Sequence, residues 1–154
     1  DYPSKHPLAG VEFQRKLERK AFAEGNGNIP IQRLEDFRNN KKTEALGKIT
    51  PEIKGKYSFA NIKNVLPKYI CDSIEEAMPY FGKKIQGFDN KDTVFAAIES
   101  RTSSPVRIIR EDDFQSVFKG VYPCGEGAGY AGGITSAAID GIKVFESIIS
   151  EFRP

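Results

Sequence analysis

The chain has 154 residues, of which 39% are hydrophobic and 29% are charged, and its formal net charge is +2. This length and composition are those of a globular protein with one sizeable core. Acidic and basic residues are interspersed, which argues against the concentrated basic face that nucleic-acid or membrane-surface binding needs. These residues contain neither a run of transmembrane length nor a signal-peptide pattern, and cytoplasmic is the default expectation.

Residue types that often carry catalysis are sparse. The two cysteines, Cys71 and Cys124, are far apart in the sequence and form no metal-ligand spacing. The single histidine, His6, lies in a proline-containing lead-in, where an exposed tail residue is expected. We therefore assign no catalytic residue and no metal site from the sequence.

The first half of the chain alternates helical patterns with polar segments. Apolar residues at helical spacing predict a helix from Leu8 to Glu24, and the glycine-asparagine run 25–28 should end it. Residues 29–31 suggest a short extended segment, and residues 32–37 fit either a helical turn or a strand. The polar composition of residues 38–58 predicts a long loop.

Further helices are expected before residue 99. Residues 61–66 suggest a short helix, and a second helix should begin near Pro67 and kink or end at Pro79. A third, short helix is expected through Val94, Phe95 and Ile98. Residues 1–98 are thus predicted to be a mainly helical region, of the kind that forms an insert or a cap.

From residue 99 onwards the character changes. Extended structure is expected at residues 102–108 and 117–122, where β-branched residues gather. A helix is then predicted from Ile134 to the C-terminus, with an apolar stripe that includes Val144, Phe145 and Ile148. The fold class predicted for the chain is α+β: a mainly helical region 1–98, and a segment 99–154 with short strands and one helix.

The glycine-rich loop before this last helix is the most informative stretch. Gly127, Gly129 and Gly132 match the pattern G-x-G-x-x-G between an expected strand and a helix. Glycine lets a ligand approach the backbone closely, and a helix N-terminus offers unpaired N–H groups to phosphate. A turn that lets the helix pack on a strand explains the glycines equally well. The candidate binding residues are Gly125, Glu126, Gly127, Ala128, Gly129, Tyr130, Ala131, Gly132, Gly133 and Ile134.

The charge of this loop limits what it could bind. It contains no Lys or Arg, so a diphosphate would be held by backbone N–H groups and the helix dipole. Glu126 would repel phosphate but could accept hydrogen bonds from the hydroxyls of a ribose or ribityl chain. Tyr130 could stack on a flavin or simply cover the loop.

The run from Tyr122 to Gly141 resembles the C-terminal signature of bacterial FAD-dependent dehydrogenases, the group labelled NAD(FAD)-utilising dehydrogenases. Residues 99–108 and 7–18 resemble the same family, in the same order along the chain. The family's N-terminal Rossmann strand and fingerprint do not appear, and the chain begins at Asp1 without Met. The resemblance therefore implies a C-terminal piece of a larger flavin oxidoreductase.

The resemblance also implies a cofactor, a partner and a domain division. The cofactor would be FAD, with NAD(P)H as a candidate electron donor, and the partner would be the remainder of the same polypeptide, which holds the ADP half of FAD. Residues 99–154 would belong to a Rossmann-like FAD-binding domain, and residues 1–98 would cover the substrate side. Arg101, Ser103 and Arg107, on one face of an extended segment, would lie near the flavin or the substrate. The isolated chain is expected to be inactive.

Two other classes of function are compatible with the residues alone. The first is a helical interaction module in which the glycine loop is only structural. The second is an independent phosphate- or nucleotide-binding protein, which the missing Gly-Lys-Ser/Thr motif and the missing second parallel strand disfavour. The substrate and the oligomeric state do not follow from the sequence.

Overall fold

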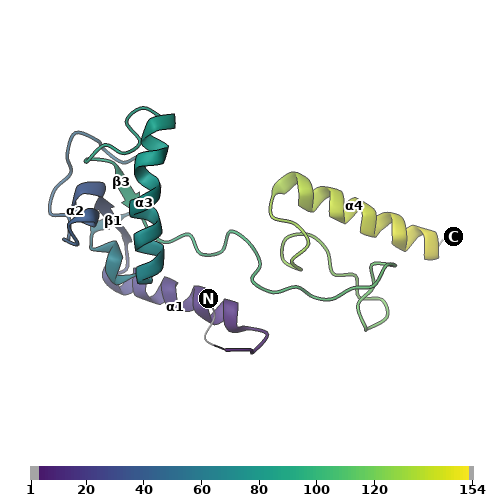
Figure 1. Ribbon diagram of the computed structural model, residues 1–154. Coiled ribbons are helices and arrows are strands. Elements are labelled where there is room, and N and C mark those ends of the chain that lie inside the picture. The colour runs from purple at the N-terminus through teal and green to yellow at the C-terminus, as the bar shows by residue number, and fades with distance from the viewer. Residues whose placement is uncertain (1–3, 153–154) are drawn as a thin grey trace. The chain divides into compact units, whose positions relative to one another are not determined.

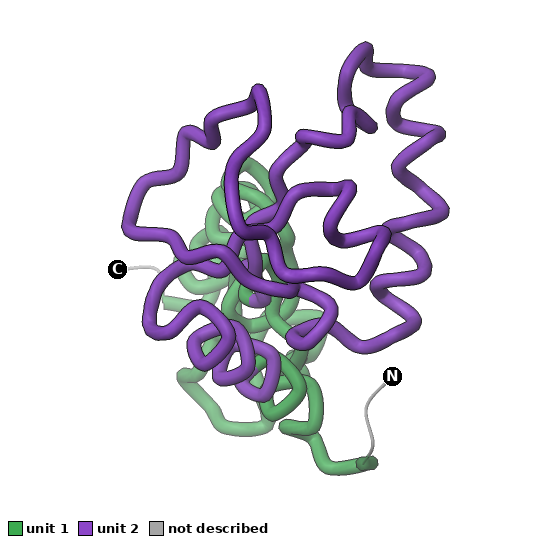
Figure 2. Tube along the Cα trace, turned by 90° about the vertical axis from the view of Figure 1, so that its left-hand side faces the viewer, with its two compact units in different colours: residues 1–14, 101–154 green, residues 15–100 purple. Residues whose placement is uncertain are grey.

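The computed structural model describes residues 4–152 (Figure 1). The chain divides into two compact units, shown in Figure 2: unit 1 comprises residues 1–14 and 101–154, and unit 2 comprises residues 15–100. The boundary near residue 14 falls within the first helix, α1 (Ala9–Glu24). None of the helices in the described part of the chain is long and apolar enough to cross a membrane.

Unit 2 is built on a small sheet with strand order β2-β1-β3. The central strand β1 (Ile29–Arg33) pairs in parallel with β2 (Tyr57–Phe59) and antiparallel with β3 (Val94–Ala96). The turn that precedes β1 needs left-handed backbone, with φ of 82° at Gly27. The expected extended segment at residues 29–31 is confirmed, and it continues to Arg33.

The core of unit 2 lies where this sheet meets three helical segments: α2 (Leu34–Arg38), the 3-10 turn η1 (Ile62–Asn64) and α3 (Lys68–Lys84). Phe37, Ile62 and Cys71 are buried together there. Phe95 of β3 contacts Phe37 edge to face, with ring centroids 5.1 Å apart. Residues 32–37, which fitted two structures, are divided between the end of β1 and α2.

Two expectations for unit 2 are wrong. Residues 94–96 form a strand rather than a helix, because pairing with β1 and the contact of Phe95 with Phe37 outweigh local helical spacing. Of the two outcomes expected at Pro79, the end of the helix is wrong, since α3 continues to Lys84. Met78 beside it is buried, and this packing outweighs the backbone hydrogen bond that proline cannot donate. The region predicted as mainly helical therefore contains all the strands of the described chain.

The loop between α2 and β2 is held by two carboxylates. Asp36 accepts hydrogen bonds from Arg33 Nε at 3.0 Å and from Thr43 Oγ1 at 2.7 Å. Asp92, which is buried, accepts from Arg33 Nη1 at 3.1 Å and from the Lys48 amide at 3.0 Å. Desolvation, the largest contribution, raises the pKa of Asp36, but the hydrogen bonds from Arg33 and Thr43 outweigh it and lower the pKa overall. The long polar segment is therefore tied to β1 and to Asp92.

Gln32 is the fully buried polar residue at the centre of unit 2. Its Nε2 donates to the Lys41 carbonyl at 2.6 Å, and its Oε1 accepts from the Ile62 amide at 2.7 Å. We predict that Gln32→Leu destabilises unit 2 by about 2–4 kcal/mol, because the Ile62 amide loses its acceptor in a buried place and the Lys41 carbonyl loses its donor. Urea unfolding followed by circular dichroism measures this change. The exposed Gln86→Leu is the control, and an equal effect of the two would contradict the argument.

Unit 1 contains α4 (Ile134–Glu151) and irregular segments before it. The predicted helix from Ile134 is confirmed. The strands expected at residues 102–108 and 117–122 are wrong, since no strand occurs in residues 99–152. Ser104 Oγ donates to the Val106 carbonyl at 2.8 Å, and Ser116 Oγ donates to the Phe118 carbonyl at 3.1 Å. These local side-chain bonds compete with strand pairing for the same backbone groups.

Candidate functional site

The glycine-rich loop of unit 1 is a turn whose shape depends on two of its glycines. Gly125 and Gly129 have φ of 68° and 84°, a region that side-chain-bearing residues rarely adopt. The Tyr130 amide donates to the Gly125 carbonyl at 3.0 Å, and the Gly129 amide donates to the Glu126 carbonyl at 2.9 Å. The turn therefore closes on itself between residues 125 and 130.

The segment that contains residues 104–108 holds the loop mainly through the loop's carbonyl groups. The Ile108 amide donates to the Ala128 carbonyl at 3.1 Å, and Arg107 Nε donates to the Gly129 carbonyl at 3.0 Å. Ser104 Oγ lies 3.2 Å from the Gly127 carbonyl oxygen. Because these contacts use acceptors of the loop, they leave several of its donors available.

Those donors lie at the edge of the loop and at the first turn of α4. Within residues 4–152, the amides of Gly127, Ala131 and Gly132 have no protein acceptor, and neither do those of Ile134 and Thr135. Ser136 Oγ is hydrogen-bonded to the Gly133 amide at 3.1 Å and lies 3.0 Å from the Gly133 carbonyl, which closes the helix start locally. The free donors suit an anion or a carbonyl-rich ring more than they suit another donor.

An ion pair fixes the loop to α4. Arg110 and Asp140 form two nearly parallel contacts, Nη2 to Oδ1 at 2.6 Å and Nη1 to Oδ2 at 3.0 Å. Asp140 Oδ2 also accepts from the Gly125 amide at 2.8 Å, and Arg110 Nη1 donates to the Pro123 carbonyl at 2.7 Å. Both side chains are nearly buried, at 10% and 12% exposure. The start of the glycine loop is therefore held by a bidentate pair.

Tyr130 completes this support. The Arg110 guanidinium carbon lies 3.6 Å from the centre of the Tyr130 ring, and that of Arg107 lies 4.9 Å from it. The Tyr130 hydroxyl donates to the Ile108 carbonyl at 3.0 Å and accepts from the Arg110 amide at 3.1 Å. Of the two roles predicted for Tyr130, its contacts within this chain match covering the loop.

Each member of the ion pair stabilises the charged form of the other. The hydrogen bond from Arg110 is the main reason that the pKa of Asp140 is lowered, and the hydrogen bond to Asp140 is the main reason that the pKa of Arg110 is raised. The pair is neutral as a whole, so it positions the loop without placing a net charge beside it. The Glu126 carboxylate, by contrast, has no hydrogen-bond or ionic partner among residues 4–152.

The glycines of the loop fall into two groups by what a side chain would meet. At Gly129 an added Cβ would lie 2.4 Å from the Val106 carbonyl oxygen, so the chain's own fold requires glycine there. At Gly127 it would meet no described atom within 4 Å, and at Gly132 and Gly133 only ordinary contacts at 3.8 and 3.6 Å. These last three have φ outside the left-handed region. Neither strain nor internal packing therefore explains Gly127, Gly132 and Gly133.

The residues proposed to lie near the flavin or substrate are only partly brought to the loop. Arg107 contacts Gly129 and Tyr130, and Ser103 Oγ would lie 3.8 Å from a Cβ at Gly132. The Ser103 carbonyl accepts from Gln14 Nε2 at 3.4 Å. Arg101 is exposed and interacts within the chain. Ser103 and Arg107 thus border the loop.

Comparison with known proteins places the chain in a family. Residues 1–102 match the family described as "FAD-dependent protein, C-terminal domain-like". The chain belongs to this family. It is also 44% identical, over 155 aligned residues, to an uncharacterized protein of Clostridium beijerinckii. That alignment covers 99% of the chain but 29% of the relative, so the chain spans less than a third of the relative's length.

The match to the FAD-dependent C-terminal domain family includes all of unit 2 and ends before the glycine-rich loop. The loop lies within the longer alignment to the Clostridium protein, which covers nearly the whole chain. Family membership therefore agrees with the implied connection to FAD-dependent proteins, while the argument for the loop depends on its own geometry.

Sequence reasoning missed Arg110 and Asp140. They lie 30 residues apart, and each looks like an ordinary surface charge in its own segment. Only the packing of the irregular segment against α4 brings them together. One pattern could have suggested the pair: Asp140 is flanked in α4 by the small and apolar residues 137–139 and 141–142, where a buried carboxylate needs a partner.

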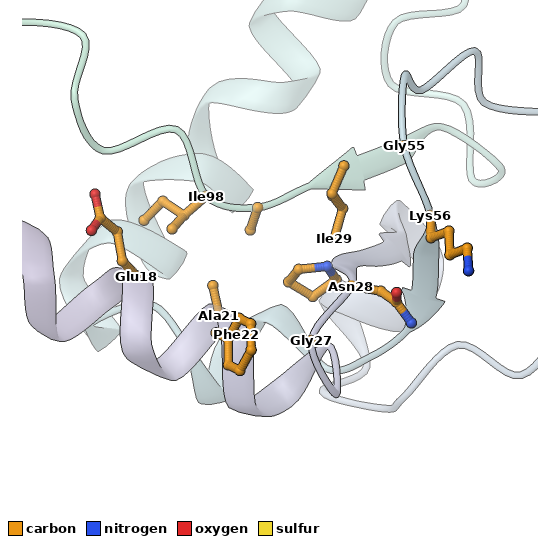
Figure 3. Close-up of a pocket in the computed structure, with 11 residues that line it drawn as sticks. Glu18, Ala21, Phe22, Gly27, Asn28, Ile29, Gly55, Lys56 and Ile98 are labelled. Carbon is orange, nitrogen blue, oxygen red and sulfur yellow. The ribbon is translucent and has the colours of Figure 1, made fainter.

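Unit 2 of this family member also has a pocket of about 500 Å³ (Figure 3). Ala21 and Phe22 of α1 lie on one side of it and Ile98 on the other. Its charged residues are Glu18, whose Oε1 accepts from Ser100 Oγ at 2.8 Å, and Lys56. No group of three or more metal-binding side chains occurs in residues 4–152. The pocket combines one acid, one base and an apolar floor, which is compatible with a small polar organic molecule.

Proposed function

We propose that this chain is the C-terminal part of a flavin-dependent oxidoreductase and that the loop Gly125–Ile134 supplies part of its FAD site. Membership of the FAD-dependent C-terminal domain family supports the first part of the proposal. The loop's geometry supports the second part. FAD would supply the electron-transfer chemistry.

The observation that carries the proposal is the open edge of the loop. An added Cβ would meet no described atom within 4 Å at Gly127 and only ordinary contacts at Gly132 and Gly133, and the neighbouring amides have no acceptor among the described residues. A cofactor with a diphosphate, a ribityl chain and a ring bearing carbonyl oxygens matches this set of donors. The N-terminus of α4 would stabilise negative charge at the pyrimidine end of a reduced flavin.

Contacts with neighbouring side chains hold the loop in place before a cofactor binds. Arg110, Asp140 and Tyr130 hold its start and its far side, so its donors would not have to be ordered when the cofactor binds. A site that is already in place avoids that loss of conformational freedom. The chain's own residues would thus position and bind the flavin, and none of them is assigned a role in proton transfer.

The remaining assignments follow from this proposal. Ser103 and Arg107, which border the loop, would lie near the flavin edge or the substrate together with Arg101. The rest of the polypeptide would form a Rossmann-like domain that holds the ADP half of FAD, with NAD(P)H as electron donor. Residues 1–98 would cover the substrate side, and the protein would be cytoplasmic. The isolated chain would bind FAD poorly and would be inactive.

The direct test is the flavin content of the complete polypeptide. We expect it to purify with the absorbance of bound flavin, or to take up added FAD with a change in flavin fluorescence. A complete polypeptide that is colourless and takes up no FAD would contradict the proposal. The chain would then be better explained as a helical interaction module, to which the exposed apolar residues of α4 are suited.

Glu126 provides a narrower prediction. Its carboxylate has no partner among residues 4–152, and we assign it to a hydroxyl group of the ribose or ribityl chain. Glu126→Ala in the complete polypeptide is expected to raise the dissociation constant of FAD about tenfold, the effect of one lost charged hydrogen bond. Glu146→Ala, at an exposed position of α4, is the control. Equal FAD retention by both variants would remove Glu126 from the site.

A further inference from the structure

Unit 1 has very little core of its own. Among its described residues, the buried hydrophobic side chains are Ala9, Ala128 and Val144. Unit 2, by contrast, buries large side chains such as Ile31, Leu34 and Phe37 completely. Two alanines and one valine exclude little apolar surface from water, so they stabilise a segment of this length only weakly. Another surface packed against unit 1 would therefore add to its stability.

The apolar side chains that unit 1 does possess gather on its surface. Along α4 they recur at intervals of three and four residues, which places them on one face of the helix. Their exposures reach 93% at Ile134, 58% at Ile142 and 59% at Phe145. We call this face the outer stripe of α4, and it comprises Ile134, Ala138, Ile142, Phe145, Ile149 and Phe152.

A second apolar patch is tied to the last turns of α4. Val117 and Phe118 are 79% and 72% exposed. The segment that carries them is attached to the helix by the Tyr122 hydroxyl, which donates to Glu151 at 2.8 Å, and by Ser147 Oγ, which donates to the Asp113 carbonyl at 2.7 Å. Monomeric proteins rarely leave large apolar patches in water, so exposed apolar side chains in this number indicate a contact surface.

We propose that the outer stripe of α4 is the surface on which the preceding part of the same polypeptide docks. The alignment with the Clostridium relative leaves about 71% of that protein outside the region this chain matches, and the matched family is a C-terminal domain. Most of such a protein therefore lies outside the matched region and is long enough to cover the helix. This inference uses the part of the proposed function that makes the chain one portion of a longer protein.

The small residues of α4 indicate how the partner approaches. Gly141 lies in the helix close to the outer stripe, and an added Cβ there would meet no described atom within 4 Å. Glycine inside a helix is destabilising relative to alanine, so internal packing gives no reason for it. With Ala138 one turn away, the helix can lie close to another backbone. The face of a sheet in the preceding domain fits a helix with this mixture of small and large apolar residues.

Radical footprinting of phenylalanine side chains tests the proposal. Phe145 and Phe152 are 59% and 62% exposed in this chain, and Phe22 in unit 2 is 69% exposed. We expect the oxidation rates of Phe145 and Phe152, normalised to Phe22, to be at least tenfold lower in the complete polypeptide than in the 154-residue chain. Equal rates in the two proteins would overturn the proposal. Protection in the short chain that increases with its concentration would also overturn it, because a second copy would then be covering the stripe.

Matched substitutions add a second measurement. Ile142→Gln in the complete polypeptide should accelerate amide exchange in α4 at least tenfold, and the neighbouring exposed Lys143→Gln should not. In the 154-residue chain neither variant should change exchange by more than about twofold. Flavin absorbance is recorded on the same samples. A protected stripe without flavin would refute the FAD proposal alone, and an oxidised stripe with flavin would refute the docking surface alone.

Discussion

Arg110→Met in the complete polypeptide is expected to destabilise the glycine loop and the first turns of α4 by about 3 kcal/mol. The substitution leaves the Asp140 carboxylate nearly buried without its bidentate partner, which is the costly way to break such a pair. It also removes the donor to Pro123 and the cation over Tyr130. Hydrogen exchange of the Gly125 amide measures the change, and a rate increase of roughly 100-fold corresponds to it.

Two further variants separate the charge of Arg110 from its shape. Arg110→Lys keeps the charge but cannot make two parallel hydrogen bonds or stack flat on a ring, so we expect it to recover less than half of the lost protection. Arg110→Met combined with Asp140→Asn removes both charges, keeps a side-chain oxygen as acceptor for the Gly125 amide and should recover part of the protection. The control is Lys68→Met, at the exposed pair of Lys68 and Asp72, where no measurable change is expected. Equal effects at the two pairs would contradict the assigned role of Arg110.

The same ion pair predicts how unit 1 responds to acid. The pKa of Asp140 is lowered in the folded chain from its ordinary value of 3.8, mainly by the hydrogen bond from Arg110. The unfolded chain then binds the proton more readily than the folded chain does. The contribution of Asp140 to stability is therefore complete above about pH 4 and is lost as the pH falls through the folded-state pKa. Asp140→Asn should abolish this dependence in the exchange of the Gly125 amide, and an unchanged acid profile would assign it to another group.

The sequence correctly predicted the elements that depend on nearby residues, such as helices with regular apolar spacing and the turns that bound them. The helix 9–24 follows from apolar spacing and ends at a glycine-asparagine turn, and α4 begins at Ile134 directly after two glycines. The parts that it missed depend on distant partners. Val94–Ala96 is a strand because it pairs with β1, which lies some 60 residues earlier in the sequence. Arg110 and Asp140 are likewise brought together by packing that neither local segment shows.

The strands predicted in residues 99–154 show the opposite situation. The composition at 102–108 and 117–122 is that of strands, but in the described residues these segments pair with no other strand. Unit 1 has little core, and the apolar side chains Val117, Phe118 and Val121 remain on its surface. The strand-like composition of such a segment reflects the strands and side chains that it packs against in the folded protein. If the proposed docking is correct, those packing partners include a domain outside this chain.

The final prediction compares two glycines of one loop. Gly129→Ala should destabilise the loop by about 3 kcal/mol, since the left-handed backbone is strained for alanine and the new Cβ would press on the Val106 carbonyl oxygen. Gly127→Ala has neither fault, because its φ is outside that region and no described atom lies within 4 Å of the added carbon. Its effect on the stability of the 154-residue chain should stay within about 0.5 kcal/mol.

In the complete polypeptide, both variants should nevertheless bind FAD more weakly. Gly129→Ala would lose the cofactor because the loop is distorted, which protein stability and flavin content would report together. Gly127→Ala would lose affinity about tenfold or more with the fold intact, because a methyl group would occupy the space assigned to the flavin. If Gly127→Ala instead destabilised the complete polypeptide and kept its flavin, the open glycine would face another protein segment. If Gly127→Ala changed neither stability nor flavin content, the space beside Gly127 would be filled by solvent. The main observation for FAD binding at this loop would then be removed.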